Sequence, residues 1–294
     1  MFTTRIFSAD MANVIVETDM TLDVDDVGAL AVIHALADRN EAQLLGVSFN
    51  EKHPDGVKGI AAINAWYDRV ETPIAQFSGT LESPDESRYL SYLAKMLDES
   101  VNVRVLDAMD FYQEILSSQQ DQSVTIISLG FLNNLAELLK THPTLIKQKV
   151  LRLVAMGGRV NDNFNFVRHE LVGESQFVIE HWPTQLVVTD FGGNLHSGVS
   201  LSSTSSKNPV REAYFRWFNR SFKGRSSWDQ VAVLVGVRGE AGGFEFVGDL
   251  AGRLQNGFTW QFDGQHRAYA RPTKSPNFYL AEIEALMSVK PRAH

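Results

Sequence analysis

Short apolar runs alternate with helical patterns along the first two thirds of this sequence, and this alternation limits the folds open to the chain more than any other feature. The runs at residues 13–18, 42–50 and 123–130 have the length of strands and are almost continuously apolar. Strands of this kind are buried on both faces, which is typical of parallel sheets covered by helices. We therefore predict an α/β fold: a doubly wound, mainly parallel sheet with helices on both faces, in which ligands bind at the carboxyl ends of the strands.

The same alternation continues to about residue 193, and the character of the sequence changes after residue 200. Further strands are expected at residues 150–158 and 184–193. Helices are expected at residues 24–38, 56–69, 88–99, 107–119, 131–142, 174–182, 210–222, 227–237 and 278–288. Residues 244–272 carry Gly, aromatic and polar residues in short alternations, which predicts a small β-meander. Since no repeat or long linker interrupts the chain, we expect a single domain over residues 1–294, with residues 1–12 as an N-terminal tail.

Composition excludes several classes of function. The chain has 294 residues and a net charge of −8, and its acidic and basic residues are mixed, without the basic stripe of a nucleic-acid groove. It has no cysteine, which rules out disulfides, thiolate metal sites and cysteine nucleophiles. No apolar run is long enough to span a membrane. The N-terminus lacks the apolar centre of a signal peptide, so we expect a cytoplasmic protein, or a periplasmic or secreted one if a signal has been removed.

The stretch "ETDMTLDVDD" at residues 17–26 places five acidic residues where the first strand gives way to a helix. Carboxylates favour helix N-termini, but capping accounts for one or two of them. A solvated acidic loop does not fit the apolar segments on either side. A bound divalent cation would offset the repulsion between the carboxylates, and oxygen ligands without cysteine favour Ca²⁺ or Mg²⁺.

Two familiar acidic motifs do not fit this stretch. An EF-hand loop beginning at Asp23 would place Val27 at its fifth position, and His34 at the twelfth position, where a bidentate Glu is required. A phosphatase that forms an aspartyl phosphate opens with a strand and D-x-D-x-T. In that alignment Glu17 would occupy the position of the nucleophile, which suits the covalent step poorly.

Four separated stretches carry motifs in a consistent order: "VETDMTLDVDDVGALAV" (16–32), "VTIISLGFLNNLAELL" (124–139), "LVAMGGRVNDNFNF" (153–166) and "WDQVAVL" (228–234). The first resembles D-T-D-P-G-x-D-D-A-x-A with two extra residues before the paired aspartates. The others resemble a strand followed by G-P-L-T-N, a Met-Gly-Gly strand end followed by E-F-N-F, and H-D-P-x-A-V. Together they are similar to the inosine–uridine nucleoside hydrolase family over roughly residues 13–237.

The resemblance implies a Ca²⁺-dependent hydrolase of N-ribosides with this α/β fold. By matching positions, it implies that Asp19 is both a metal ligand and the base toward water, and that Asp25 and Asn165 bind the ribose. Glu17 would brace the aspartates from behind, whereas Asp23 lies in the extra length and receives no role. The metal ligands implied by the resemblance are Asp19, Asp26, the backbone carbonyl of Leu129, and Asp229.

The sequence departs from the family pattern mainly on the side of the leaving group. Trp228 replaces the usual His before Asp229, and we expect it either to stack on the substrate or to pack in the core. Asn163 replaces the Glu of E-F-N-F and is expected to contact the substrate in its place. Gly192 stands where a Glu often follows the fifth strand.

Replacement acids are sought among the histidines of the crevice loops. His53 follows the second strand and His169 follows Asn165, so both are candidates for the catalytic acid; the alternatives are an ordinary loop histidine and a surface ion pair. His196 is a weaker candidate near the end of the fifth strand. The basic residues of 211–225 are interpreted as a solvated face of mixed charge.

These features predict hydrolysis of the N-glycosidic bond of a ribonucleoside, or of a related pentoside, by water that an aspartate activates at a calcium site. A protein that binds nucleosides or sugars with Ca²⁺ but has lost turnover is one alternative. A hydrolase of non-nucleoside carbohydrate is another, since one scaffold hosts several functions. The expected partner is a small molecule, not nucleic acid or a membrane, and the family resemblance also suggests a homo-oligomer.

Overall fold

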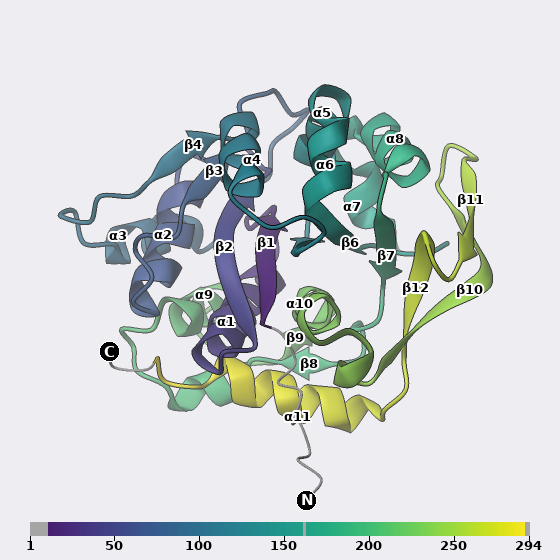
Figure 1. The fold of residues 1–294 in the computed structure, drawn as a ribbon. Helices are drawn as coiled ribbons and strands as arrows, with labels where there is room; N and C mark the ends of the chain where they lie inside the picture. Colours follow the sequence, from purple (N-terminus) through teal and green to yellow (C-terminus); the bar gives the residue numbers. More distant parts are fainter. Residues whose placement is uncertain (1–10, 161–162, 292–294) are drawn as a thin grey trace, which may run out of the picture.

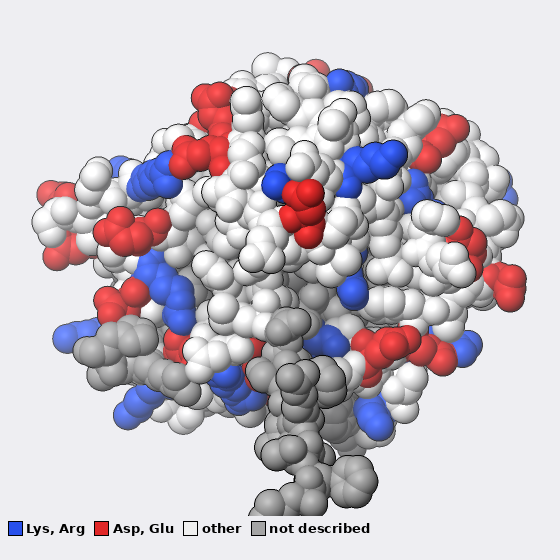
Figure 2. All heavy atoms as spheres, viewed as in Figure 1, with Lys and Arg blue, Asp and Glu red and all other residues white. Residues whose placement is uncertain are grey.

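The computed structural model describes residues 11–160 and 163–291 of the chain. Residues 1–10 of the expected N-terminal tail lie outside the described residues. So do residues 161 and 162, which belong to the third of the family-like motifs. No helix in the described part of the chain is long and apolar enough to cross a membrane. On the face drawn in Figure 2, Lys and Arg lie interspersed with Asp and Glu, and no continuous basic stripe is visible there.

A ten-stranded sheet forms the centre of the described structure, in the order β11-β10-β12-β7-β6-β5-β1-β2-β3-β4 (Figure 1). All neighbouring strands from β12 to β4 are parallel, and β10 is antiparallel to both β11 and β12. These strands are β1 (Ala12–Thr18), β2 (Ala42–Phe49), β3 (Ile74–Gln76), β4 (Val105–Asp107), β5 (Val124–Ser128), β6 (Val150–Met156), β7 (Gln185–Thr189), β10 (Phe244–Arg253), β11 (Thr259–Asp263) and β12 (Arg267–Pro272). A separate small pair joins β8 (His196–Ser197) to β9 (Arg225–Ser226).

Helices cover both faces of this sheet, as predicted (Figure 1). They are α1 (Asp25–Asp38), α2 (Gly56–Trp66), α3 (Leu90–Met96), α4 (Ala108–Ser117), α5 (Asn133–Thr141), α6 (Pro143–Lys149), α7 (Phe164–Val167), α8 (Val172–His181), α9 (Pro209–Trp217), α10 (Trp228–Arg238) and α11 (Pro276–Met287). Successive strand residues point to opposite faces, so Ile127 packs in the core that includes α1 and α10, and Ile126 in the core that includes α4 and α5. Both faces of the sheet are therefore shielded from solvent, which explains why the strand sequences are continuously apolar.

Several short elements were not predicted, namely β3, β4, α6, α7 and the pair of β8 and β9, and the C-terminal strands differ in detail from the expectation. β3 and β4 have three residues each, too few to produce an apolar run, and α6 begins at Pro143 directly after α5. The expected antiparallel strands are present within 244–272. However, β10 lies between β11 and β12, and β12 joins β7, so these strands extend the main sheet and do not form a separate meander.

The order of the strands reverses between β1 and β5. From β1 the chain proceeds through β2, β3 and β4 in one direction, and from β5 through β6 and β7 in the other. Loops that leave the carboxyl ends of two such strands diverge and leave a crevice between them, which is where open α/β sheets bind ligands. The turn after β1 that contains the acidic stretch opens into this crevice.

Helix α1 is buried on almost all sides, because it lies against the sheet and is covered by α10 and α11. Its one histidine, His34, has no exposed surface; the ring stacks on Tyr67, and Nε2 lies 3.0 Å from Oδ1 of Asn64. Since an amide oxygen only accepts, Nε2 carries the hydrogen of a neutral ring. Burial, reinforced by the charge of Arg69, lowers the pKa of His34 from 6.5 to about 3.

This buried histidine makes stability depend on pH. The unfolded chain binds a proton at His34 near pH 6.5, whereas the folded protein does so only near pH 3. The contribution of neutral His34 to the free energy of unfolding is therefore complete above pH 6.5. As the pH falls toward 3, this free energy decreases by up to about 1.4 kcal/mol per pH unit. We expect urea unfolding to show wild type losing stability relative to His34→Gln between about pH 6 and about pH 4. Exposed His181→Gln is the control, and equal slopes for wild type and His34→Gln would contradict the prediction.

Candidate active site

A pocket of about 300 Å³ lies at the carboxyl ends of β1, β5 and β6, a volume at the lower end of the usual range for small-molecule sites. The turn between β1 and α1 supplies most of its acidic wall. The segments after β5 and β6, the first residues of α7, and the junction of β9 with α10 complete it. The lining residues are Asp19, Leu22, Asp23, Asp25, Asp26, Leu129, Met156, Phe164, Asn165, Arg225, Trp228 and Asp229.

Three buried carboxylates converge in this pocket. Asp25, Asp26 and Asp229 each offer an oxygen, and these atoms lie within 4.8 Å of one another. The three residues are 2–4% exposed, and Oδ1 of Asp229 has no hydrogen-bond partner in the described structure. Asp25 and Asp26 begin α1 and Asp229 lies in the first turn of α10, so two helix N-termini face the same point. The backbone of the two helices thus brings together residues that are far apart in the sequence.

The electrostatics of the three carboxylates favour a cation. Burial and the charges of Asp25 and Asp26 raise the pKa of Asp229 well above its usual value. Burial also raises the pKa of Asp26 to about 6, even though the Thr18 hydroxyl donates to its Oδ1 at 2.5 Å. A divalent cation would restore the charged form of all three. The donors are all oxygen atoms, including an unpartnered one, so this group of residues fits a hard metal ion.

Asp19 lies beside this trio but is not part of it. It lines the pocket next to Asp26, and burial, Asp26 and Glu51 raise its pKa well above the usual range. Its side chain lies against Gly130: a Cβ at that glycine would fall 2.6 Å from Oδ1 of Asp19. Asp19, predicted to be a metal ligand, thus lies at the pocket wall, whereas Asp25, predicted to bind the sugar, belongs to the trio.

The backbone carbonyl of Leu129, also predicted as a metal ligand, belongs to the segment that follows β5. It accepts a hydrogen bond at 2.5 Å from Nδ2 of Asn165, the residue predicted to bind ribose. Both residues line the pocket. The side chain of Leu129 is buried in the core, so only its backbone is available to a ligand.

Glu17 lies beneath the pocket at the end of β1 and has no exposed surface. Its carboxylate accepts hydrogen bonds from Ser48 and Tyr112, both at 2.8 Å, and from Asn50 at 3.3 Å. Burial raises the pKa of Glu17 to about 7, against the effect of these donors. The residue thus joins β1 to β2 and α4 behind the aspartates, the position that the sequence suggested for it.

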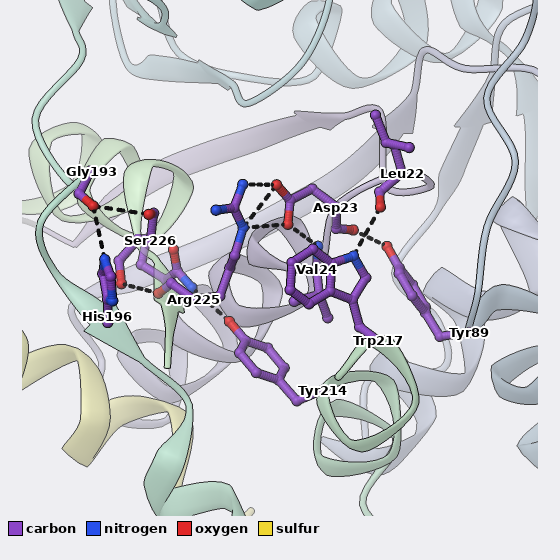
Figure 3. A network of polar contacts seen from close by, with 12 residues as sticks. Leu22, Asp23, Val24, Tyr89, Gly193, His196, Tyr214, Trp217, Arg225 and Ser226 are labelled. Atoms are coloured by element: carbon purple, nitrogen blue, oxygen red, sulfur yellow. Dashed lines mark hydrogen bonds and ion pairs between the residues drawn. The ribbon is translucent and has the colours of Figure 1, made fainter. Parts of the chain in front are cut away.

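Asp23, which received no role from the sequence, is held by Arg225 (Figure 3). The guanidinium Nε donates to Oδ1 and Oδ2 at 2.8 and 3.0 Å, and Nη2 forms the ion pair with Oδ2. Tyr89 donates its hydroxyl to the Asp23 carbonyl at 2.5 Å, and Trp217 donates to the carbonyl of Leu22 at 3.0 Å. These contacts fix the two-residue extension. They also correct our interpretation of Arg225, which lines the pocket and is not part of a solvated face.

Arg225 is the only basic residue among those that line the pocket in the described structure. Its guanidinium lies over the rings of Trp217 and Trp228, 5.3 and 5.0 Å from their centroids. Trp228 itself lines the pocket, and its stacking on a substrate stays a prediction. The unexplained charge of Asp23 indicated that a basic partner was needed, but nothing in the local sequence identified Arg225 as that partner.

Three predicted site residues lie outside the pocket lining. Asn163 donates from Nδ2 to the carbonyls of Val160 and Arg253, so its amide joins a loop to β10. His53 accepts a hydrogen bond from the backbone N–H of Asp55 at 3.1 Å. His169 points toward Glu51 and Asp85. Polar groups outside the pocket lining hold each of these side chains: those of its own loop for His53, and those of distant segments for Asn163 and His169.

Gly192, where a glutamate was expected from the family pattern, is required by close packing. It has φ +138°, and a Cβ there would lie 2.7 Å from the carbonyl of Ser227 and from the backbone of Trp228. The start of α10, which carries Trp228 and Asp229, therefore packs directly on this glycine. No side chain is tolerated at that position.

Solved structures with the same fold include several nucleoside hydrolases. The inosine-uridine preferring nucleoside hydrolase from Bacillus anthracis aligns with a TM-score of 0.72 and 16% identity, covering 95% of this chain and 99% of that one. The purine-preferring ribonucleoside hydrolase from Gardnerella vaginalis gives 0.68 and 15%, covering 94% and 99%. The type III effector protein XopQ, solved with adenosine diphosphate ribose, gives 0.69 and 12%, covering 96% and 94%. At these identities the likeness establishes the fold.

The family follows from the sequence match. Comparison with curated proteins gives no match. The family model described as inosine-uridine preferring nucleoside hydrolase matches residues 14–176, more than half of the chain, and this range contains the acidic turn, Leu129 and Asn165. The chain therefore belongs to the inosine-uridine preferring nucleoside hydrolase family and is a glycosidase, an N-ribosyl hydrolase.

Proposed function

We propose that the protein hydrolyses the N-glycosidic bond of a ribonucleoside or a closely related pentoside with the aid of Ca²⁺. The observation that carries this proposal is the convergence of Asp25, Asp26 and Asp229, whose oxygens lie within 4.8 Å of one another in a buried pocket. An all-oxygen donor set suits calcium better than a transition metal. Asp19 and the carbonyl of Leu129, in the same pocket, are available to complete the coordination.

When bound, the cation supplies positive charge that lowers the pKa of water and offsets the repulsion of the aspartates. Asp19 accepts the proton of the attacking water, because its carboxylate faces the pocket and burial raises its basicity. Asp25 accepts hydrogen bonds from the sugar hydroxyls, and the amide of Asn165 exchanges hydrogen bonds with them. The same buried carboxylates stabilise the positive charge that develops on the sugar as the bond breaks.

The leaving base is placed against the apolar and cationic side of the pocket. Trp228 and Phe164 offer aromatic faces, on which a nucleobase stacks. Arg225 remains charged at all relevant pH values, and it stabilises negative charge on a departing base without transferring a proton. Because His53 and His169 lie outside the pocket lining, this electrostatic assistance takes the place of a catalytic acid.

Removal of the cation tests the proposal. We expect treatment with a calcium chelator to abolish release of ribose from a panel of purine and pyrimidine nucleosides, and excess Ca²⁺ to restore it. Adenosine diphosphate ribose and simple pentosides belong in the same panel, to separate nucleosidase activity from action on other ribosyl compounds. Calcium-dependent binding without turnover of any compound would contradict the proposal, as would turnover that persists after chelation.

A further inference from the structure

A second group of ligand-type side chains lies outside the pocket. Glu51 follows β2, Asp85 lies in the loop before α3, and His169 lies in the turn of 3₁₀ helix η1 (Arg168–Glu170) after α7. Oε2 of Glu51 is 3.1 Å from Nε2 of His169, and Oδ2 of Asp85 is 3.7 Å from the same nitrogen. The three side chains are 0–5% exposed, and we call them the Glu51–Asp85–His169 cluster.

Each member of this cluster leaves one atom without a hydrogen-bond partner in the described structure, and all three such atoms meet. They are Oε2 of Glu51, Oδ2 of Asp85 and Nε2 of His169, which lie within 4.8 Å of one another. Buried polar atoms are almost always paired, so three unpaired ones at a single point indicate a missing ligand.

The other polar atoms of the cluster are already bound, which orients the free ones. Nδ1 of His169 lies 2.7 Å from the carbonyl of Glu82, and a carbonyl only accepts, so Nδ1 carries the hydrogen. In the neutral ring Nε2 is then a lone pair. The Lys52 N–H donates to Oε1 of Glu51 at 2.6 Å, and Arg168 pairs with Oδ1 of Asp85. Second-sphere bonds of this type accompany metal-ligating histidines and carboxylates in proteins.

Three acceptors that face one another repel unless a cation lies between them. A proton on Nε2 of His169 could form a hydrogen bond with Glu51, but Asp85 lies too far from this nitrogen to share it. A metal ion between the three side chains would contact all of them. An ion with bonds of about 2.0–2.2 Å in tetrahedral geometry separates its donors by about 3.3–3.6 Å, close to the spacings of 3.1 and 3.7 Å. The imidazole distinguishes this donor set from the all-oxygen pocket and favours a first-row transition metal over calcium.

We propose that the Glu51–Asp85–His169 cluster is a second metal site, which binds Zn²⁺ or a similar first-row divalent ion. The ion would join three segments that are separate in sequence: the turn after β2, the loop before α3, and the turn after α7. Helix α7 carries Phe164 and Asn165 of the pocket, so the ion would fix one wall of the active site. The proposal stands on the cluster alone and does not depend on the reaction or on Ca²⁺.

The test is a Zn²⁺ and Co²⁺ titration of the chelator-treated full chain in excess Ca²⁺, read as bound metal after dialysis and as visible absorption of Co²⁺. We expect about one equivalent of Zn²⁺ per chain, and an affinity lowered at least about 100-fold in His169→Gln and in Asp85→Asn. His181→Gln, which removes an exposed histidine, and Asp26→Asn, in the pocket, should retain it. Asp85→Asn provides a second test if His169→Gln does not fold.

Several results would overturn the site. If wild type binds no Zn²⁺ or Co²⁺, the cluster is a buried ion pair held by a proton. If His169→Gln and Asp85→Asn bind as tightly as wild type, the metal lies elsewhere. If Asp26→Asn abolishes binding and His169→Gln does not, the metal occupies the pocket. Failure of nucleoside hydrolysis affects none of these readouts, since metal binding is measured directly.

Discussion

Asp19→Asn is expected to lower kcat for nucleoside hydrolysis by about 10²–10⁴, the range that a positioned general base contributes. The amide keeps the size of the side chain beside Gly130 but cannot accept the proton of water at neutral pH. The pocket retains Asp25, Asp26 and Asp229, so the metal trio remains complete. The measurement is the steady-state rate of ribose release at saturating nucleoside and Ca²⁺.

Two controls separate loss of the base from loss of the metal. Asp26→Asn removes a member of the trio, so its activity should depend on a higher Ca²⁺ concentration and recover in part when Ca²⁺ is raised. Asp19→Asn should not recover. Asp121→Asn makes the same change at an exposed ion pair with Lys149 and should leave kcat unchanged. Wild-type kcat in Asp19→Asn would show that another group activates the water.

The sequence predicted that the acidic turn after the first strand lies at the pocket, because the residues of this turn are close together in the chain; their role as metal ligands stays a prediction. Asp19, Asp25 and Asp26 follow directly after a strand whose burial is evident from its composition, and the fold leaves a turn at a strand end little freedom. Asp229 was found through its motif at the start of a helix. Periodicity and topology predict where the acidic turn lies, whereas the roles of Asp19, Asp26 and Asp229 as metal ligands are what the family resemblance implies.

The other half of the pocket depends on contacts between distant segments. Asp23 and Arg225 are 202 residues apart, and only the fold shows that they pair. Asp23 looked unexplained because its partner looked like a solvated arginine. The same limit applies to His169, whose residue has φ 52°, so the left-handed backbone and the Glu82 carbonyl decide where its ring points. The position of a histidine next to a motif predicts that the residue lies near the site, but not where its ring points.

Substitution of Gly130 is expected to have the second large effect on activity, since this glycine limits the space around Asp19, the proposed base. The glycine follows Leu129 after β5, and a Cβ there would fall 2.6 Å from Oδ1 of Asp19 and 2.7 Å from its Cβ and Cγ. Real Cβ atoms do not approach so closely, and the half-buried side chain of Asp19 borders the pocket, where there is space for it to be displaced. In Gly130→Ala the carboxylate must therefore move away from the position in which it faces water.

We expect Gly130→Ala to lower kcat about 100-fold, the usual cost of displacing a catalytic group by about 1 Å, with a loss of about 1–3 kcal/mol in unfolding free energy from overpacking. Asp25, Asp26 and Asp229 all remain, so Ca²⁺ should still raise the melting temperature of the variant. The matched control is Gly173→Ala in α8, where a Cβ meets no atom within 4 Å. That change should leave kcat unaltered and slightly raise stability, because alanine favours the helix. If both variants retain wild-type kcat, the position of Asp19 does not limit the rate. If Gly130→Ala loses its stabilisation by Ca²⁺ as well, the displaced carboxylate also acts as a metal ligand, as the family resemblance implied.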